Sequence, residues 1–180
     1  MSQLPEPTNS LSPGALKVYN KLLEKRGSVD GLYESMLNHP KALKHIGQLG
    51  TYLRFEGALP DDIREIIILY VSKKLNCGYE WIKHEPYAIK AGISEEIIDK
   101  IKAGKPHSEF SNRISQTMQI ADCVLNRVSI PDELHNSVEK DLGTKDLIEL
   151  VILCGFYSLI ASFTLAFDVP LPQGFEDPFK

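Results

Sequence analysis

The chain has 180 residues and a formal net charge of −4, from 20 basic and 24 acidic side chains. This length suits one domain with a hydrophobic core, and because no basic or basic–aromatic cluster is visible, we expect no nucleic-acid partner. Three cysteines are too few and too scattered for a secreted disulfide framework, and no signal-peptide pattern is visible, so we expect a reducing, cytoplasmic location.

Apolar residues recur every three or four positions along most of the chain, which predicts an all-α protein. Residues 1–10 are polar and contain prolines, so we expect a flexible N-terminal arm. A single all-helical domain is then expected over residues 11–180. Glycine and proline signals such as Gly27, Gly57 and Pro131 divide it into about seven to eight helices.

One predicted helix begins at residues 59–62, where a proline and two acidic residues are typical of a first turn. The helix is apolar on nearly every side, so we expect it to be buried. Glu65 lies inside this apolar run. Burial would raise the pKa of its carboxyl group unless a partner compensates, which makes Glu65 a candidate for acid–base chemistry.

The next predicted helix carries several reactive side chains. Asn76 is predicted to be its N-cap, which places Cys77 in the first turn. The positive end of the helix dipole favours a thiolate, so we expect a lowered pKa for Cys77. Glu80 follows three residues later and His84 seven residues later, so we expect all three side chains to share one helix face.

The order of these residues resembles the carboxymuconolactone decarboxylase and alkylhydroperoxidase D-like family. The resemblance implies a small protein of bundled, orthogonal helices that assembles as a homotrimer or homohexamer. The family's peroxidase branch has a glutamate, a Cys-x-x-Cys motif and then a histidine. Glu65, Cys77 and His84 stand at the first, second and last of these positions, but Glu80 replaces the second cysteine.

This replacement favours the decarboxylase branch over the peroxidase branch. Peroxidase chemistry of the family's kind needs two thiols that cycle through a disulfide, and one thiol beside a carboxylate cannot do so. The decarboxylase branch implies a lyase or isomerase that needs no cofactor or metal and acts on a small carboxylated molecule. We expect a histidine to deliver the proton while a glutamate holds its tautomer. The candidate catalytic residues are His84, Glu65, Glu80 and Cys77, and the candidate substrate-binding residues are Tyr79 and Trp81.

Two other classes of protein stay open. The first is a peroxiredoxin-like antioxidant in which Cys77 uses a resolving thiol from Cys123, Cys154 or another subunit. Such a disulfide requires the two Cα atoms to lie within about 7 Å. The second is a helical binding protein without catalysis, in which the buried acid and the aromatic side chains only stabilise the fold.

The last predicted helix contains eighteen consecutive uncharged residues, 150–167. This length is marginal for a membrane span, but the run contains polar residues and is flanked by the acidic residues Glu149 and Asp168. We therefore expect no membrane partner. Burial in the core of a homo-oligomer explains the run better.

A shift of 84 residues aligns Glu149 with Glu65, together with the apolar residues that follow each of them. A degenerate internal repeat of residues 57–105 and 141–170 would explain this match, and so would chance similarity between two buried helices. If the repeat is real, only the first copy keeps the reactive residues.

Overall fold

The computed structural model describes residues 2–5, 11–27, 29 and 31–180. These residues form nine α-helices, one 3₁₀ turn and no strand, which confirms the predicted all-α class. This number is slightly larger than the seven to eight helices expected. The elements are α1 (Pro13–Arg26), α2 (Leu32–Met36), α3 (Pro40–Phe55), α4 (Asp61–Lys74), α5 (Gly78–Lys90), α6 (Glu95–Lys102), η1 (His107–Glu109), α7 (Asn112–Asn126), α8 (Asp132–Leu142) and α9 (Thr144–Ala166).

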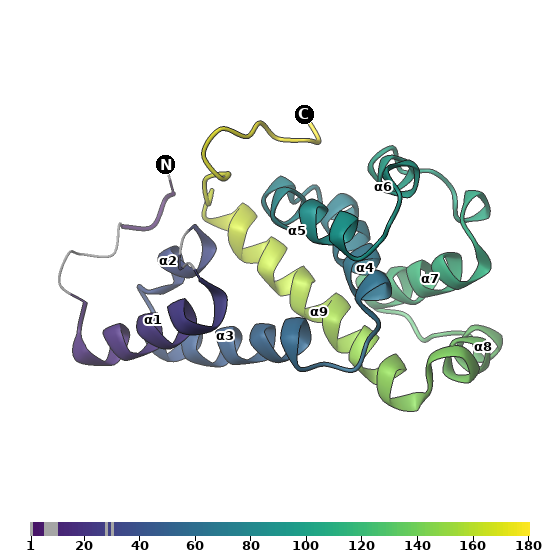
Figure 1. Ribbon diagram of the computed structural model, residues 1–180, viewed down its shortest axis with the longest axis horizontal. Helices are drawn as coiled ribbons and strands as arrows, with labels where there is room; N and C mark the ends of the chain where they lie inside the picture. Colours follow the sequence, from purple (N-terminus) through teal and green to yellow (C-terminus); the bar gives the residue numbers. More distant parts are fainter. Residues whose placement is uncertain (1, 6–10, 28, 30) are drawn as a thin grey trace.

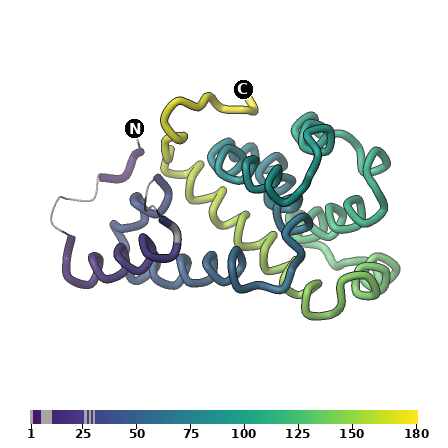
Figure 2. The backbone as a smooth tube through the Cα atoms, viewed as in Figure 1, coloured from purple at the N-terminus to yellow at the C-terminus, as the bar shows by residue number. Residues whose placement is uncertain are grey.

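Helix α9 runs through the middle of the molecule (Figures 1 and 2), with α1 to α3 on its left and α4 to α8 on its right. It packs against α3, α4, α7 and α8. Leu150, Leu153 and Ile160 on its inward face are at most 1% exposed. Burial of apolar area contributes roughly 25 cal/mol per Å², so this helix stabilises both halves of the fold.

The opposite face of α9 is exposed. Ile148, Ile152 and Leu159 on this face are 42–57% exposed. Within the described residues, α9 is the one helix long and apolar enough to cross a membrane, but 56% of its apolar window is buried, as in a core helix. The predicted burial of its outer face in a homo-oligomer stays a prediction.

Helix α4 is the second buried helix, as its apolar pattern predicts. Ile63, Ile67 and Ile68 have no exposed surface, because α4 packs against α5 on one side and α9 on another. This packing leaves Glu65 only 2% exposed. A carboxylate at such a position needs polar partners, since burial of an unpaired charge is costly.

Residues 2–5 lie beside the C-terminal end of α9. The backbone N–H of Gln3 donates to the carbonyl oxygen of Phe167 at 2.9 Å, and the Gln3 amide donates to Asp168 Oδ2 at 2.8 Å. The predicted flexible arm covers residues 1–10, of which 1 and 6–10 lie outside the described residues. The part that is described is therefore attached to the last helix.

Glu149 holds the connection between α3 and α4. Its Oε2 accepts hydrogen bonds from Tyr52 and from the Ala58 N–H, both at 3.0 Å, and its Oε1 accepts one from the Leu59 N–H at 3.1 Å. Gly57 allows this approach, since a β-carbon there would overlap the carboxylate. In the predicted repeat Glu149 matches Glu65, yet it binds backbone amides and a phenol; the repeat itself stays a prediction.

Alanine at Gly57 tests this contact. The added β-carbon would lie 2.9 Å from Glu149 Cδ, so we expect Gly57→Ala to lower the free energy of unfolding by ~1–3 kcal/mol through loss of the buried hydrogen bonds. Gly155→Ala in α9 is the matched control, because nothing lies within 4 Å of its added β-carbon. Helix propensity should make that variant more stable by up to ~1 kcal/mol. Urea unfolding of both variants, followed by circular dichroism, gives the comparison, and equal effects would contradict this role of Glu149.

Candidate functional site

The centre of the site is a buried pair formed by Glu65 of α4 and His84 of α5. Glu65 Oε2 lies 2.8 Å from His84 Nδ1, and Arg64 Nε donates to Glu65 Oε1 at 3.2 Å. Burial alone would raise the pKa of the Glu65 carboxyl group, but the hydrogen bonds and charges of His84 and Arg64 lower it below its usual value. Glu65 is therefore an ionised acceptor that fixes the orientation of the imidazole.

The other ring nitrogen of His84 faces a phenol and a second carboxylate. Tyr157 Oη lies 3.1 Å from His84 Nε2, and Glu80 Oε2 lies 3.6 Å from the same nitrogen. When the neutral ring donates from Nδ1 to Glu65, Nε2 is the acceptor and Tyr157 is the donor. Burial, together with the charge of Glu80, raises the pKa of Tyr157 well above its usual value, so the phenol keeps its proton.

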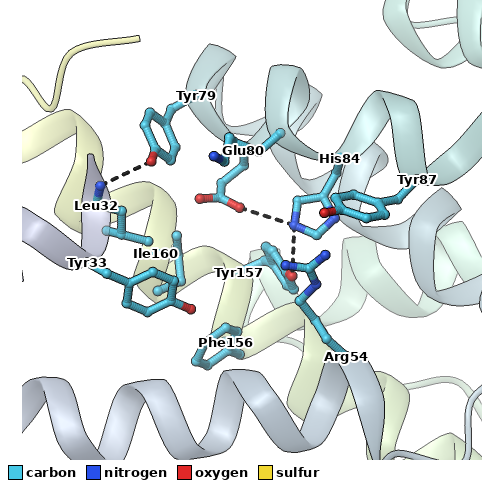
Figure 3. A pocket seen from close by; sticks show the side chains of 11 residues that line it. Leu32, Tyr33, Arg54, Tyr79, Glu80, His84, Tyr87, Phe156, Tyr157 and Ile160 are labelled. Carbon is cyan, nitrogen blue, oxygen red and sulfur yellow. Dashed lines mark hydrogen bonds and ion pairs between the residues drawn. The ribbon is translucent and has the colours of Figure 1, made fainter. Parts of the chain in front are cut away.

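These groups meet at a pocket between α2, α3, α5 and α9 (Figure 3). The pocket holds about 80 Å³, which is smaller than the 300–1,000 Å³ typical of ligand sites. Glu65 does not line the pocket, and it reaches the site through its contact with His84 Nδ1. The lining residues are Leu32, Tyr33, Arg54, Tyr79, Glu80, Lys83, His84, Tyr87, Phe156, Tyr157 and Ile160.

Arg54 of α3 brings a cation to the pocket. Its guanidinium carbon lies 4.5 Å from the ring centroid of Tyr87 and 5.0 Å from that of Phe55. Burial would lower the pKa of Arg54, but the neighbouring Tyr157, Tyr87 and Glu65 raise it above its usual value. A guanidinium fixed between aromatic rings is suited to bind a carboxylate.

The candidate substrate-binding residues Tyr79 and Trp81 lie in different places. Tyr79 lines the pocket, and its hydroxyl oxygen accepts a hydrogen bond from the Leu32 N–H at 3.1 Å, which joins α2 to α5. Trp81 is fully buried outside the pocket, where its ring meets that of Phe179 at 5.4 Å between centroids. The structure thus gives Trp81 a packing role.

Cys77 differs from two expectations. Asn76 adopts a left-handed conformation (φ 51°), so Cys77 is itself the N-cap and does not share the face of Glu80 and His84. Its Sγ lies 3.2 Å from Thr164 Oγ1 and outside the pocket lining. Burial raises the pKa of the thiol and outweighs the lowering by Thr164 and by the backbone N–H groups at the start of α5, so the predicted lowered pKa is wrong.

Cys154 is not placed to act as a resolving thiol for Cys77. All three cysteines are free. Cys154 lies ten residues before Thr164 on α9, or ~15 Å along the helix, which is beyond the reach of a disulfide with Cys77. Burial also raises the pKa of Cys154 to about 12. Within the described residues, no group of three histidine, cysteine, aspartate or glutamate side chains could hold a metal ion.

The sequence pattern identified Glu65, Glu80 and His84, and the structure brings them together. The sequence pattern missed Tyr157 and Arg54, which belong to helices far along the chain from α5. The one hint for Tyr157 is a phenol inside a long apolar run, since a buried tyrosine usually needs a polar partner. The sequence around Arg54 contains no comparable hint of a role in the site.

Comparisons with known proteins agree with this fold. The chain has the AhpD core fold: it superposes on a peroxidase-related protein from Ralstonia eutropha JMP134, titled alkylhydroperoxidase AhpD core, with a TM-score of 0.79, 15% identity and coverage of 99% of this chain and 94% of that chain. A second peroxidase-related protein, from Silicibacter sp. TM1040, gives a TM-score of 0.78, 15% identity and coverage of 99% and 96%. At this identity the likeness concerns the fold alone.

The carboxymuconolactone decarboxylase family model matches residues 40–127. This segment extends from α3 through α7 and includes Glu65, Cys77, Glu80 and His84. The predicted resemblance to this family is therefore confirmed. No curated protein matches this sequence.

Glu65→Gln tests the buried pair through the pH dependence of stability. The folded-state pKa of Glu65 lies below the ordinary value of 4.5, so the ionised pair should contribute its full stability above pH ~4.5 and lose it as pH falls through the lower, folded-state pKa. At pH 7 the variant should lose ~3 kcal/mol, because a buried group loses its charged partner. The difference between wild type and variant should shrink below pH 4. Urea unfolding at several pH values measures it, and a constant difference would contradict the ionised pair.

Proposed function

We propose that this protein is an acid–base lyase or isomerase of the carboxymuconolactone decarboxylase type, which acts on a small carboxylated molecule without a cofactor. The observation that carries this proposal is the 2.8 Å contact between Glu65 and His84 beside a pocket lined by His84, Tyr157 and Arg54. An oriented imidazole is a competent proton donor and acceptor near neutral pH.

In the decarboxylation direction, the bond between the carboxylate carbon and the neighbouring carbon breaks and CO₂ leaves. The electron pair stays on the substrate and passes into its conjugated carbonyl system. His84 then delivers a proton from Nε2 to the carbon that lost CO₂, and solvent restores that proton for the next turnover. Glu80 Oε2, 3.6 Å from Nε2, is placed to accept a hydrogen bond from the Nε2–H before transfer.

Arg54 and Lys83 are the cationic side chains of the pocket lining. We assign to Arg54 the binding of a substrate carboxylate or lactone carbonyl, since its position between Tyr87 and Phe55 orients the guanidinium. A pocket of about 80 Å³ has room for one such group and the adjoining atoms, because a water molecule occupies about 30 Å³. The rest of the substrate would lie along the rim formed by Tyr33 and Tyr87.

His84→Gln tests the proton transfer. With a carboxymuconolactone as the first substrate, we expect kcat to fall ~10²–10⁴-fold, since this is the usual contribution of general acid–base catalysis. Tyr157→Phe should lower kcat less, because it removes only the phenol that hydrogen-bonds to Nε2. His45→Gln is the matched control, because His45 is exposed on α3. Turnover of His84→Gln within about threefold of wild type would refute the role.

A thiol peroxidase is the alternative suggested by the titles of the two similar structures. Two observations weigh against it: Glu80 stands where a second cysteine would be, and Cys77 is 1% exposed with a raised pKa. A thiol that keeps its proton is a poor nucleophile. A binding protein without catalysis is less favoured than the enzyme, because His84 and Glu80 line an open pocket.

Peroxide treatment separates the two enzymatic possibilities. We expect the number of titratable thiols in the denatured protein to be unchanged after a short pulse of hydrogen peroxide, because Cys77 is buried and protonated. Thiol counting with an aromatic disulfide reagent, before and after the pulse, measures it. Loss of two thiols per chain would support the peroxidase instead.

A further inference from the structure

A groove between α1 and α3 forms a second concave surface, separate from the pocket beside His84. Its volume is about 1170 Å³, against about 80 Å³ for that pocket. The residues that line the groove lie within 12–25 and 38–56, and none of them lines the His84 pocket. The two helices pack against each other on the left of Figure 1. The groove is therefore independent of the proposed lyase chemistry.

The floor of the groove is apolar. Ala15 and Leu22 of α1 are 3% and 6% exposed, and Val18 between them is partly buried. Spacings of three and four residues place these side chains on one face of the helix. A β-carbon at Gly47 of α3 would lie 2.8 Å from Leu22 Cδ2, so the α3 backbone approaches Leu22 closely. This floor suits an apolar stripe of a ligand, because both surfaces would leave water on contact.

Lysines form both walls of the groove. Three occupy every fourth position of α1, and two lie in the first two turns of α3: Lys17, Lys21, Lys25, Lys41 and Lys44. All five are exposed, and none of them forms an ion pair within the described part of the chain. Glu56 is the one acidic residue of the described lining. The lysines are scattered along the sequence, and the fold collects them at one groove.

The positive charge extends along the groove. Lys17 and Lys25 are separated by two turns of α1, or ~12 Å along the helix axis. A ligand with a single anionic head group, such as a fatty acid, would use the charge at one end only. Bases of single-stranded nucleic acid stack on aromatic rings or arginine, and no Phe, Tyr, Trp or Arg belongs to the described lining. The groove therefore fits a ligand with carboxylates on both sides of an apolar stripe.

We propose that this groove binds an acidic amphipathic helix of a partner protein. The apolar face of that helix rests on Ala15, Val18 and Leu22, and its Asp and Glu side chains pair with the lysines of both walls. A helix ~10 Å wide and ~15 Å long occupies roughly 1,200 Å³, which matches the groove volume of about 1170 Å³. The positive walls also accelerate the encounter with an acidic partner.

Fluorescence anisotropy of a labelled peptide with the full chain tests the groove. The peptide is an amphipathic helix of ~15 residues, with leucine on one face and glutamate on the other. We expect Lys21→Glu to raise its Kd about three- to tenfold, because an attraction becomes a repulsion. Val18→Thr should raise it about two- to fivefold, since a hydroxyl replaces an apolar methyl group of the floor. Lys145→Glu is the matched control, with the same charge change at an exposed position of α9 outside the groove.

Further probes distinguish the helix from other occupants of the groove. A peptide with the same residues in scrambled order should bind several-fold more weakly, because its leucines no longer share one face. Equal affinity of the two peptides, or no saturable binding of either, would overturn the proposal. Tighter binding of single-stranded DNA or of dodecanoate than of the peptide, lost in Lys21→Glu, would assign the groove to that ligand instead. A change in mass by light scattering for Lys21→Glu but not for Lys145→Glu would show that a second copy of this chain covers the groove, which also contradicts the proposal.

Discussion

The hydrogen-bonded pair of Glu65 and His84 is the interaction on which the rest of the site depends. A carboxylate that is 2% exposed would be costly without partners, and here the imidazole and Arg64 lower its pKa. Glu65 hydrogen-bonds to Nδ1 of His84, so that Nε2 of the same ring faces Tyr157, Glu80 and the pocket. The same contact therefore stabilises the packing of α4 against α5 and fixes the orientation of the His84 ring.

Helix α5 has a polar pocket on one side and a buried surface on another. Glu80 and His84 face a polar pocket, whereas Cys77 and Trp81 are covered by α9 and by residues 177–179. Cys77 is the N-cap and has non-helical backbone angles, so the rule that residues three or four apart share a helix face does not extend to it. Trp81 follows Glu80 by one position, which turns its side chain by roughly 100° around the helix. Cys77 is therefore close to Glu80 and His84 in sequence but lies outside the pocket that they line.

Helix α9 supplies the polar contacts that complete this arrangement. Along one buried face it places Glu149 against the connection between α3 and α4, Tyr157 against His84, and Thr164 against Cys77. Its apolar residues form part of the core, and Glu149, Tyr157 and Thr164 each form a hydrogen bond with a different segment of the chain. The long uncharged run is better explained by this central position than by a membrane.

The sequence by itself determined the all-helical class, the burial of α4 and the candidates Glu65, Glu80 and His84, because helical periodicity and short spacings are local properties of the chain. Only the tertiary structure decided that Tyr157, 73 residues from His84, meets Nε2, that Arg54 lines the pocket, and that Cys77 is buried and protonated. The physical reason is that burial and electrostatic environment depend on which distant segments pack together. The start of α5 alone favours a thiolate at Cys77, and its burial in the folded domain reverses that preference.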